Sequence, residues 1–205
     1  MRLGTRHPDL YGRVLRVIAA AVLALCAPLH AAAQAPQDAL RSYLLVARPG
    51  MPDPNFRETV LLVSHLEGKH TFGVILNRPT GESLSTLLPT ERFRQFREPV
   101  HAGGPVAPNA LAALFRAEKS PGEAFAILPG LFLTPAPGTI DELLARPPAA
   151  LRLFVGYAGW APGQLAAEIA RGDWLVVKPT LDLVMRRDTR NLWRELVDRA
   201  RATRA

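Results

Sequence analysis

Histidine is the residue most able to do chemistry in this sequence of 205 residues, and only three histidines follow residue 33. His65 and His70 flank a four-residue turn, so both could reach one metal ion, with Glu67 as a third ligand. Beyond residue 33 there is no cysteine to complete a structural zinc site. We therefore interpret the pair as solvated turn residues and assign no metal and no cofactor, with a weak surface site as the alternative.

Nucleophilic catalysis would require a serine, a histidine base and an acid. His101 with Asp53 or Ser64 supplies these residue types. The sequence has no Gly-x-Ser-x-Gly elbow, and the adjacent Ser64 and His65 would point to opposite faces of a strand. No catalytic residue is therefore assigned, and a hydrolase of unrecognised type using His101 with Asp53 or Ser64 is the alternative hypothesis.

Turns with unusual backbones offer a site that binds without reacting. They comprise a proline-rich loop over residues 48–55, turns at 77–81 and 101–105, and a glycine-rich corner at 156–164. The corner is either a pocket or a rigid structural junction, and the paired glycines either cradle an anion or form a plain turn. We predict a non-enzymatic binding or regulatory module for an unidentified small molecule or protein, with these candidate binding residues: Asp53, Asn77, Arg78, Gly103, Gly104, Tyr157, Gly159, Trp160 and Gln164.

The first 33 residues have the layout of a secretory signal peptide. Four arginines precede a thirteen-residue apolar run over 17–29, which is shorter than the roughly 20 residues of a spanning helix. Ala31 and Ala33 then supply a small-residue cleavage site. We predict cleavage after Ala33, a periplasmic or secreted protein, and no membrane span in residues 34–205. Retention of the segment as an anchor is the alternative.

Loss of this segment changes the chemistry of what remains. It takes four of the 25 basic residues and one of the 18 acidic ones, which leaves a formal charge of +4. It also takes Cys26, the only cysteine, and so excludes thiol chemistry and disulfides. The arginines after residue 185 alternate with acids, as in a solvated helix face, and export removes the usual nucleic-acid partners. Nucleic-acid binding is therefore expected only if the signal is not used.

The elements that must position these residues can be read from the apolar pattern. Strands are expected over 43–47, 59–64, 71–76, 151–157 and 174–177, the second and third forming a hairpin, and a strand or a helix over 109–116. Helices are expected at 83–88, from Thr139 as N-cap, from Pro162 to Gly172, and from Asp188 or Thr189 to the C-terminus, with a charged surface stretch over 90–98. Without strict alternation of strand and helix, the pattern predicts one α+β domain over 34–205, with mixed sheets, short helices and a C-terminal amphipathic helix.

Five blocks of this sequence together resemble a known bacterial family. They are Gly50-Met-Pro-Asp-Pro-Asn-Phe56, Gly73-Val-Ile-Leu-Asn-Arg-Pro79, Gly103-Gly-Pro-Val106, Gly156-Tyr-Ala-Gly-Trp160 with the following Gly163-Gln-Leu165 and Glu168-Ile169, and Asp173-Trp174. In this order they are similar to the YqgE/AlgH family. The resemblance implies an α+β domain with no established cofactor or catalytic residue, in a family with one branch linked to regulation of alginate production. Members usually look cytoplasmic, so the export signal and the Arg-rich end set this chain apart.

Overall fold

The computed structural model describes residues 42–65, 71–87, 89–94, 96–97 and 99–202. The predicted signal peptide over 1–33 lies outside these residues, as do Glu67 and His70. The structure therefore does not test the cleavage site or the two-histidine metal site. The description below concerns the unit that begins after the N-terminal segment.

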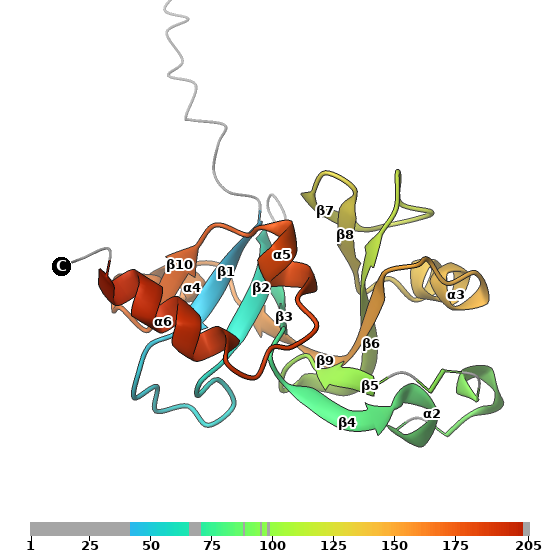
Figure 1. Cartoon of the computed structure of the whole chain (residues 1–205), viewed down its shortest axis with the longest axis horizontal. Coiled ribbons are helices and arrows are strands. Elements are labelled where there is room, and N and C mark those ends of the chain that lie inside the picture. The colour runs from blue at the N-terminus through green and yellow to red at the C-terminus, as the bar shows by residue number, and fades with distance from the viewer. Residues whose placement is uncertain (1–41, 66–70, 88, 95, 98, 203–205) are drawn as a thin grey trace, which may run out of the picture. The chain divides into compact units, whose positions relative to one another are not determined.

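Four antiparallel strands form one half of the sheet, in the order β10, β1, β2, β3 (Figure 1). They are β1 (Ser42–Ala47), β2 (Val60–His65), β3 (Thr71–Ile75) and β10 (Trp174–Val177). The first three are mostly apolar and almost wholly buried, because this part of the sheet is covered on both faces. The predicted hairpin over 59–76 is confirmed, with Leu61 opposite Ile75 and Ser64 opposite Phe72.

The strand β9 (Leu151–Trp160) joins this half to the rest of the sheet. Its last three residues pair with β3, and most of its length pairs antiparallel with β6 (Val106–Arg116). A hairpin of β7 (Phe125–Leu128) and β8 (Leu131–Thr134) continues the sheet beyond β6. On its other side β9 pairs parallel with β5 (Pro99–Ala102), which in turn pairs with β4 (Pro79–Ser83). The sheet is therefore mixed but mostly antiparallel.

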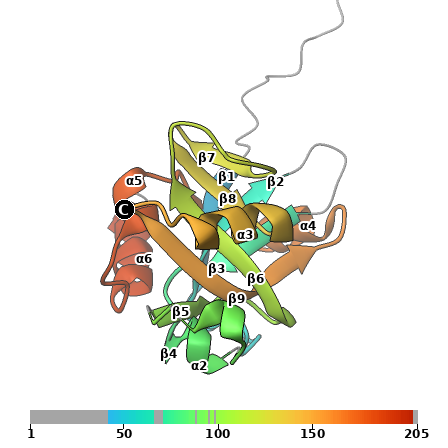
Figure 2. The same ribbon diagram turned by 90° about the vertical axis from the view of Figure 1, so that its right-hand side faces the viewer.

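Short helices cover the sheet. Beside β1, β2 and β10 lie α4 (Gln164–Ala170), α5 (Leu181–Met185) and α6 (Leu192–Ala202), and beside β6 lies α3 (Pro137–Ala145) (Figures 1 and 2). The one-turn helices α2 (Leu84–Leu87) and η1 (Glu91–Phe93) follow β4. The apolar face of α6, formed by Leu192, Leu196 and Val197, packs into the core, so the predicted amphipathic helix is present. Mixed sheet and short helices confirm the α+β class in its coarse form.

Several predicted helix boundaries differ from those of the structure. Thr139 is not an N-cap: α3 begins two residues earlier, with Pro137 in its first turn, and the Thr139 hydroxyl donates to the Glu123 carbonyl at 3.2 Å. Similarly, α4 begins at Gln164 rather than Pro162, and α6 begins at Leu192 rather than near Asp188, whose carboxylate instead binds Arg190. The stretch 90–98 is not simply surface, because Phe93 is buried in the core beneath α3.

The glycine pair at 103–104 sits where two backbones come into close contact. Gly103 donates from its N–H to the Val155 carbonyl at 2.8 Å and accepts from the Ile75 N–H at 2.9 Å. A Cβ on Gly103 would overlap the Gly156 carbonyl oxygen, and one on Gly104 would overlap the backbone of Tyr157. Glycine is therefore required so that β9 can lie against the chain that links β5 to β6. This favours the structural interpretation of the turn over an anion cradle.

We predict that Gly103→Ala lowers the free energy of unfolding by about 3 kcal/mol, since the new methyl group must displace backbone rather than a side chain. Gly138→Ala is the matched control, because a Cβ at that position in α3 has no atom within 4 Å. It should leave stability unchanged or raise it by less than about 1 kcal/mol. Urea unfolding followed by circular dichroism measures both, and equal stability of the two variants would contradict the close-contact argument.

Candidate functional site

Three of the predicted binding residues hold the loop after β1: Asn77 and Arg78 tie it to the chain after β3, and Asp53 bonds within it. The Asn77 side chain accepts from the Val60 N–H at 2.8 Å and donates to the Glu58 carbonyl at 2.9 Å. Arg78 donates to the Asn55 carbonyl at 2.8 Å, and Asp53 accepts from the Asn55 N–H at 2.8 Å. The structure thus brings Asp53, Asn77 and Arg78 together, and their polar groups hold the loop after β1 in place.

A second set lies around the carboxylate of Glu168. Its Oε2 accepts from the indole N–H groups of Trp160 and Trp174 at 2.9 and 3.0 Å, and its Oε1 accepts from the Gln164 amide at 3.0 Å. Phe56 stacks on Trp160 with ring centroids 6.2 Å apart. Because Trp160 is only 3% exposed, this cluster acts as a structural joint between β9 and α4.

The predicted strand-to-helix corner at 156–164 is placed differently from expectation. Its first five residues, 156–160, belong to β9 itself, and the chain turns only after Trp160. Tyr157 packs on Phe72 with ring centroids 5.0 Å apart, and Gly159 pairs opposite Phe72 in β3. These residues therefore build the sheet junction.

The hydrolase arrangement is not assembled. Ser64 lies on β2, where its hydroxyl accepts from Ser42 at 3.2 Å, and its neighbour in β3, Phe72, lies opposite Gly159 of β9. His101 lies on β5, opposite Phe154 of β9. Five residues of β9 separate the two positions, or about 16 Å along the strand. Asp53 bonds to the Asn55 N–H within its own loop, and the Nδ1 of His101 has no hydrogen-bond partner among the described residues.

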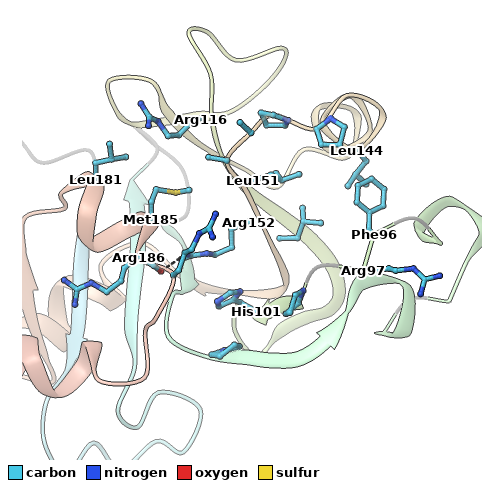
Figure 3. Close-up of a pocket in the computed structure, with 18 of the residues that line it drawn as sticks. Phe96, Arg97, His101, Arg116, Leu144, Leu151, Arg152, Leu181, Met185 and Arg186 are labelled. Atoms are coloured by element: carbon cyan, nitrogen blue, oxygen red, sulfur yellow. Dashed lines mark hydrogen bonds between the residues drawn. The ribbon is translucent and has the colours of Figure 1, made fainter.

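His101 instead lines an open groove of about 1500 Å³ (Figure 3). We refer to it as the basic groove. Its walls come from β4 and β5, from the turn between α3 and β9, and from α5 with the turn that follows. Its charged lining consists of five arginines and one acid among the described residues: Arg97, Arg116, Arg152, Arg186, Arg187 and Asp182.

Strand register explains why three polar residues meet on the floor of the basic groove. Arg152 of β9 lies opposite Leu114 of β6, and Phe154 lies opposite His101 of β5. Alternate residues of a strand share a face, so Arg116, Arg152 and His101 occupy the same face of three adjacent strands. Their positions are diagonal neighbours, at a typical spacing of about 7–8 Å.

Arg152 is a half-buried cation whose hydrogen bonds go to neutral groups. Its Nη1 donates to the Val184 carbonyl at 3.1 Å. Its Nη2 donates to the Arg186 carbonyl at 2.6 Å (Figure 3). Burial lowers the pKa of Arg152 from its ordinary value. Among the described residues no carboxylate pairs with it. The guanidinium thus fixes the end of α5 while its charge stays uncompensated.

His101 is held neutral beside this cation. Its ring packs on Phe154 with centroids 5.6 Å apart, and its buried Nδ1 has no hydrogen-bond partner among the described residues. Burial, and after it the charge of Arg152, lowers the pKa of His101 to about 4. The imidazole is therefore uncharged at neutral pH and can either donate or accept a hydrogen bond.

Other arginines near the C-terminus are largely compensated. Arg186 pairs with both Asp182 and Glu195, Arg190 with Asp188, and Arg199 with Glu195. Such pairing fits the predicted solvated helix face better than a surface for nucleic acid.

Sequence reasoning missed the basic groove, although one signal for it was present. In the run Leu151-Arg-Leu-Phe154, Arg152 shares the alternation of the buried Phe154, so a charge falls on an apolar face. A charge on such a face requires a partner or a function.

In the described part of the chain, no three His, Cys, Asp or Glu side chains gather closely enough to hold a metal ion. None of the helices described there has both the length and the apolar character to cross a membrane.

The low pKa of His101 has a consequence for stability. Between pH 6.5, its ordinary pKa, and about pH 4 the unfolded chain takes up a proton that the folded chain does not. As the pH is lowered through this window, the free energy of unfolding should therefore fall by about 1 kcal/mol after allowance for solvent screening. His101→Gln should flatten that part of the profile, as measured by urea unfolding at half-unit pH steps. Parallel profiles for the two proteins would contradict a depressed pKa.

Comparison with known proteins agrees with this fold. The family described as AlgH-like (DUF179) matches residues 44–204. A UPF0301 protein of Streptomyces avermitilis is 40% identical over 174 residues, covering 79% of this chain and 87% of the relative, and one of Myxococcus xanthus is 35% identical over 155 residues, covering 73% and 84%.

Two solved structures share the architecture. The solution structure of the AlgH protein from Pseudomonas aeruginosa superposes with a TM-score of 0.62 at 27% identity, covering 82% of this chain and 92% of that one. A crystal structure of a Corynebacterium diphtheriae protein gives 0.60 at 25% identity, covering 77% and 85%. The family resemblance of the five sequence blocks is thereby confirmed, and the chain belongs to the AlgH-like family, whose function is uncharacterised.

Proposed function

We propose that this chain is an exported, non-enzymatic binding module whose ligand site is the basic groove. The observation that carries the proposal is that the cation Arg152, which has no acidic partner among the described residues, and the unbonded Nδ1 of His101 meet on the floor of an open concavity of about 1500 Å³. Binding sites typically combine a concave, partly apolar surface with a few fixed polar groups. Leu144, Leu151 and Met185 supply the apolar part of the wall.

The chemistry of the lining favours binding over catalysis. Among the described residues that line the basic groove there is no serine, threonine, cysteine, lysine or glutamate. The one acid, Asp182, is paired with Arg186, and His101 has no acidic partner to orient it. A relay of nucleophile, base and acid needs all three groups within hydrogen-bond reach, so the hydrolase alternative has little support here.

The exported location rests on the sequence. A basic start, a thirteen-residue apolar run and a small-residue cleavage pattern agree with each other over residues 1–33. A small ligand or a protein partner outside the cytosol is consistent with this location, and a nucleic acid is not.

Export predicts a defined N-terminus. Protein recovered from the periplasmic or secreted fraction of the producing cells should begin at Gln34, with residues 1–33 removed after Ala33. N-terminal sequencing of each cell fraction measures this directly. A chain that retains Met1 in the cytosol would contradict export and would restore the nucleic-acid hypothesis.

If the ligand binds in the basic groove, a bulky side chain placed in the groove should block binding. Metabolite and cell-wall fragment mixtures should contain a component that raises the thermal unfolding midpoint, since a ligand at about 100 times its Kd stabilises by about 2.7 kcal/mol. Ala149→Trp, on the exposed wall of the groove, should abolish that shift.

Ala126→Trp is the matched control for this experiment, because Ala126 is exposed on β7 and does not line the basic groove. It should bind like the unmodified protein. Turnover of a component of the mixture would reject the non-enzymatic proposal, and a ligand that Ala126→Trp affects as much as Ala149→Trp would place the site elsewhere.

A further inference from the structure

The charge of Arg152 is the least satisfied feature of the described residues. Its two hydrogen bonds go to the carbonyls of Val184 and Arg186, which bind N–H groups but carry no negative charge. Burying a cation without a counter-ion costs free energy, and native proteins normally pair such a charge. The groove above Arg152 is where a counter-ion could enter.

We propose that the basic groove binds an oxyanion, the phosphate or carboxylate group of a small molecule, against Arg152 with His101 and Arg116 beside it. This inference rests on the proposed binding function and names the chemical class of its ligand.

The donor arrangement on Arg152 suits such a group. A guanidinium has five N–H donors, and two are used by the carbonyls of the α5 segment, which leaves three. The two existing bonds fix the plane of the guanidinium, so less side-chain entropy is lost when a ligand binds. A planar fork with fixed orientation matches the paired oxygens of a carboxylate or phosphate.

His101 adds a neutral hydrogen-bonding group at the same place. It lies diagonally across from Arg152 on the floor, and no described residue bonds to its Nδ1. An uncharged imidazole beside the oxyanion can hydrogen-bond to a hydroxyl or a protonated oxygen of the ligand. A nearby anion would also favour the protonated ring, which opposes the effect of Arg152.

The surrounding charges favour an anion over a cation. Arg186 is compensated by Asp182 and Glu195, whereas Arg116 and Arg187 have no acidic partner among the described residues. Arg116 occupies the same face as Arg152, one strand away, and its exposed side chain can close over a bound group. The positive potential of a concave site raises the local concentration of anions and repels metal ions.

The test uses the purified protein with three oxyanion probes, inorganic phosphate, sulfate and acetate, at constant ionic strength. Isothermal titration gives the affinity, and ¹⁵N-detected spectra of the arginine Nε–H groups locate the contact. Phosphate or sulfate should shift the Arg152 resonance, assigned by its loss in Arg152→Lys. That variant should weaken binding about tenfold or more, as expected for losing charge-assisted bonds.

Two further variants keep the test decisive if Arg152→Lys unfolds. Arg116 takes no part in the hydrogen bonds that hold α5, so Arg116→Gln should lower the affinity for the anion several-fold and leave the unfolding midpoint unchanged. Arg57→Gln is the charge-matched control, because Arg57 is exposed in the loop after β1 and does not line the basic groove. It should change affinity less than twofold.

The outcomes separate this inference from the proposed function. If no probe moves the Arg152 resonance while a neutral ligand binds the groove, the oxyanion assignment is wrong and the binding function stands. Weakening by Arg57→Gln equal to that by Arg116→Gln would mean attraction to the overall charge, and would also overturn the assignment. Probe binding at Arg152 accompanied by turnover of a phosphate or carboxylate ester would support the oxyanion site and reject the non-enzymatic function.

Discussion

Close contact between two backbones organises this fold. Gly103 and Gly104 lie directly against Gly156 and Tyr157 of β9, with no room for a Cβ between them. At this point β9 changes partner, from β5 to β3 on one side, while β6 follows it on the other. The two halves of the sheet can share one strand only because these chains approach each other so tightly. The loop after β1, the tryptophan joint at Glu168 and the floor of the basic groove all take their positions from β9.

The same strand connects structure to electrostatics. Residues of β9 on one face, Arg152 and Phe154, meet His101 from β5, while the end of α5 is held above them by the bonds from Arg152. One guanidinium therefore both fastens the last part of the chain to the sheet and leaves a positive charge facing an open groove. The depressed pKa of His101 follows from this arrangement, since the imidazole sits half-buried beside that charge.

The sequence was informative wherever local physics decides the outcome. The apolar, β-branched runs of β2 and β3 and the amphipathic pattern of α6 predicted their elements, and the five blocks predicted the family. Helix starts were misplaced because other groups compete for the capping side chains: the Thr139 hydroxyl bonds to the distant Glu123, and the Asp188 carboxylate binds the nearby Arg190.

The site was harder to predict because the role of each residue depends on which elements of the fold pack against it. His101 was singled out for catalysis, yet its partners turned out to be Phe154 and Arg152 rather than an acid. Arg152 shares a strand face with the buried Phe154, but the sequence does not show that α5 ends beside it and takes its hydrogen bonds. Of the predicted binding residues, Asn77, Arg78 and Trp160 use their polar groups to bond to the protein itself.

The place of β9 in the chain has a consequence for how the protein forms. β3 can pair with β2, and β6 with β8, before residue 151 is synthesised, but each gains its second neighbour only when β9 is present. Sheets closed by such distant segments fold slowly, because the entropy of loop closure is lost before the contacts form. The junction between the two halves of the sheet therefore cannot form until residues 151–160 have been synthesised. For a protein proposed to cross a membrane through a narrow translocation channel, late formation of this junction favours an unfolded chain that can pass through the channel.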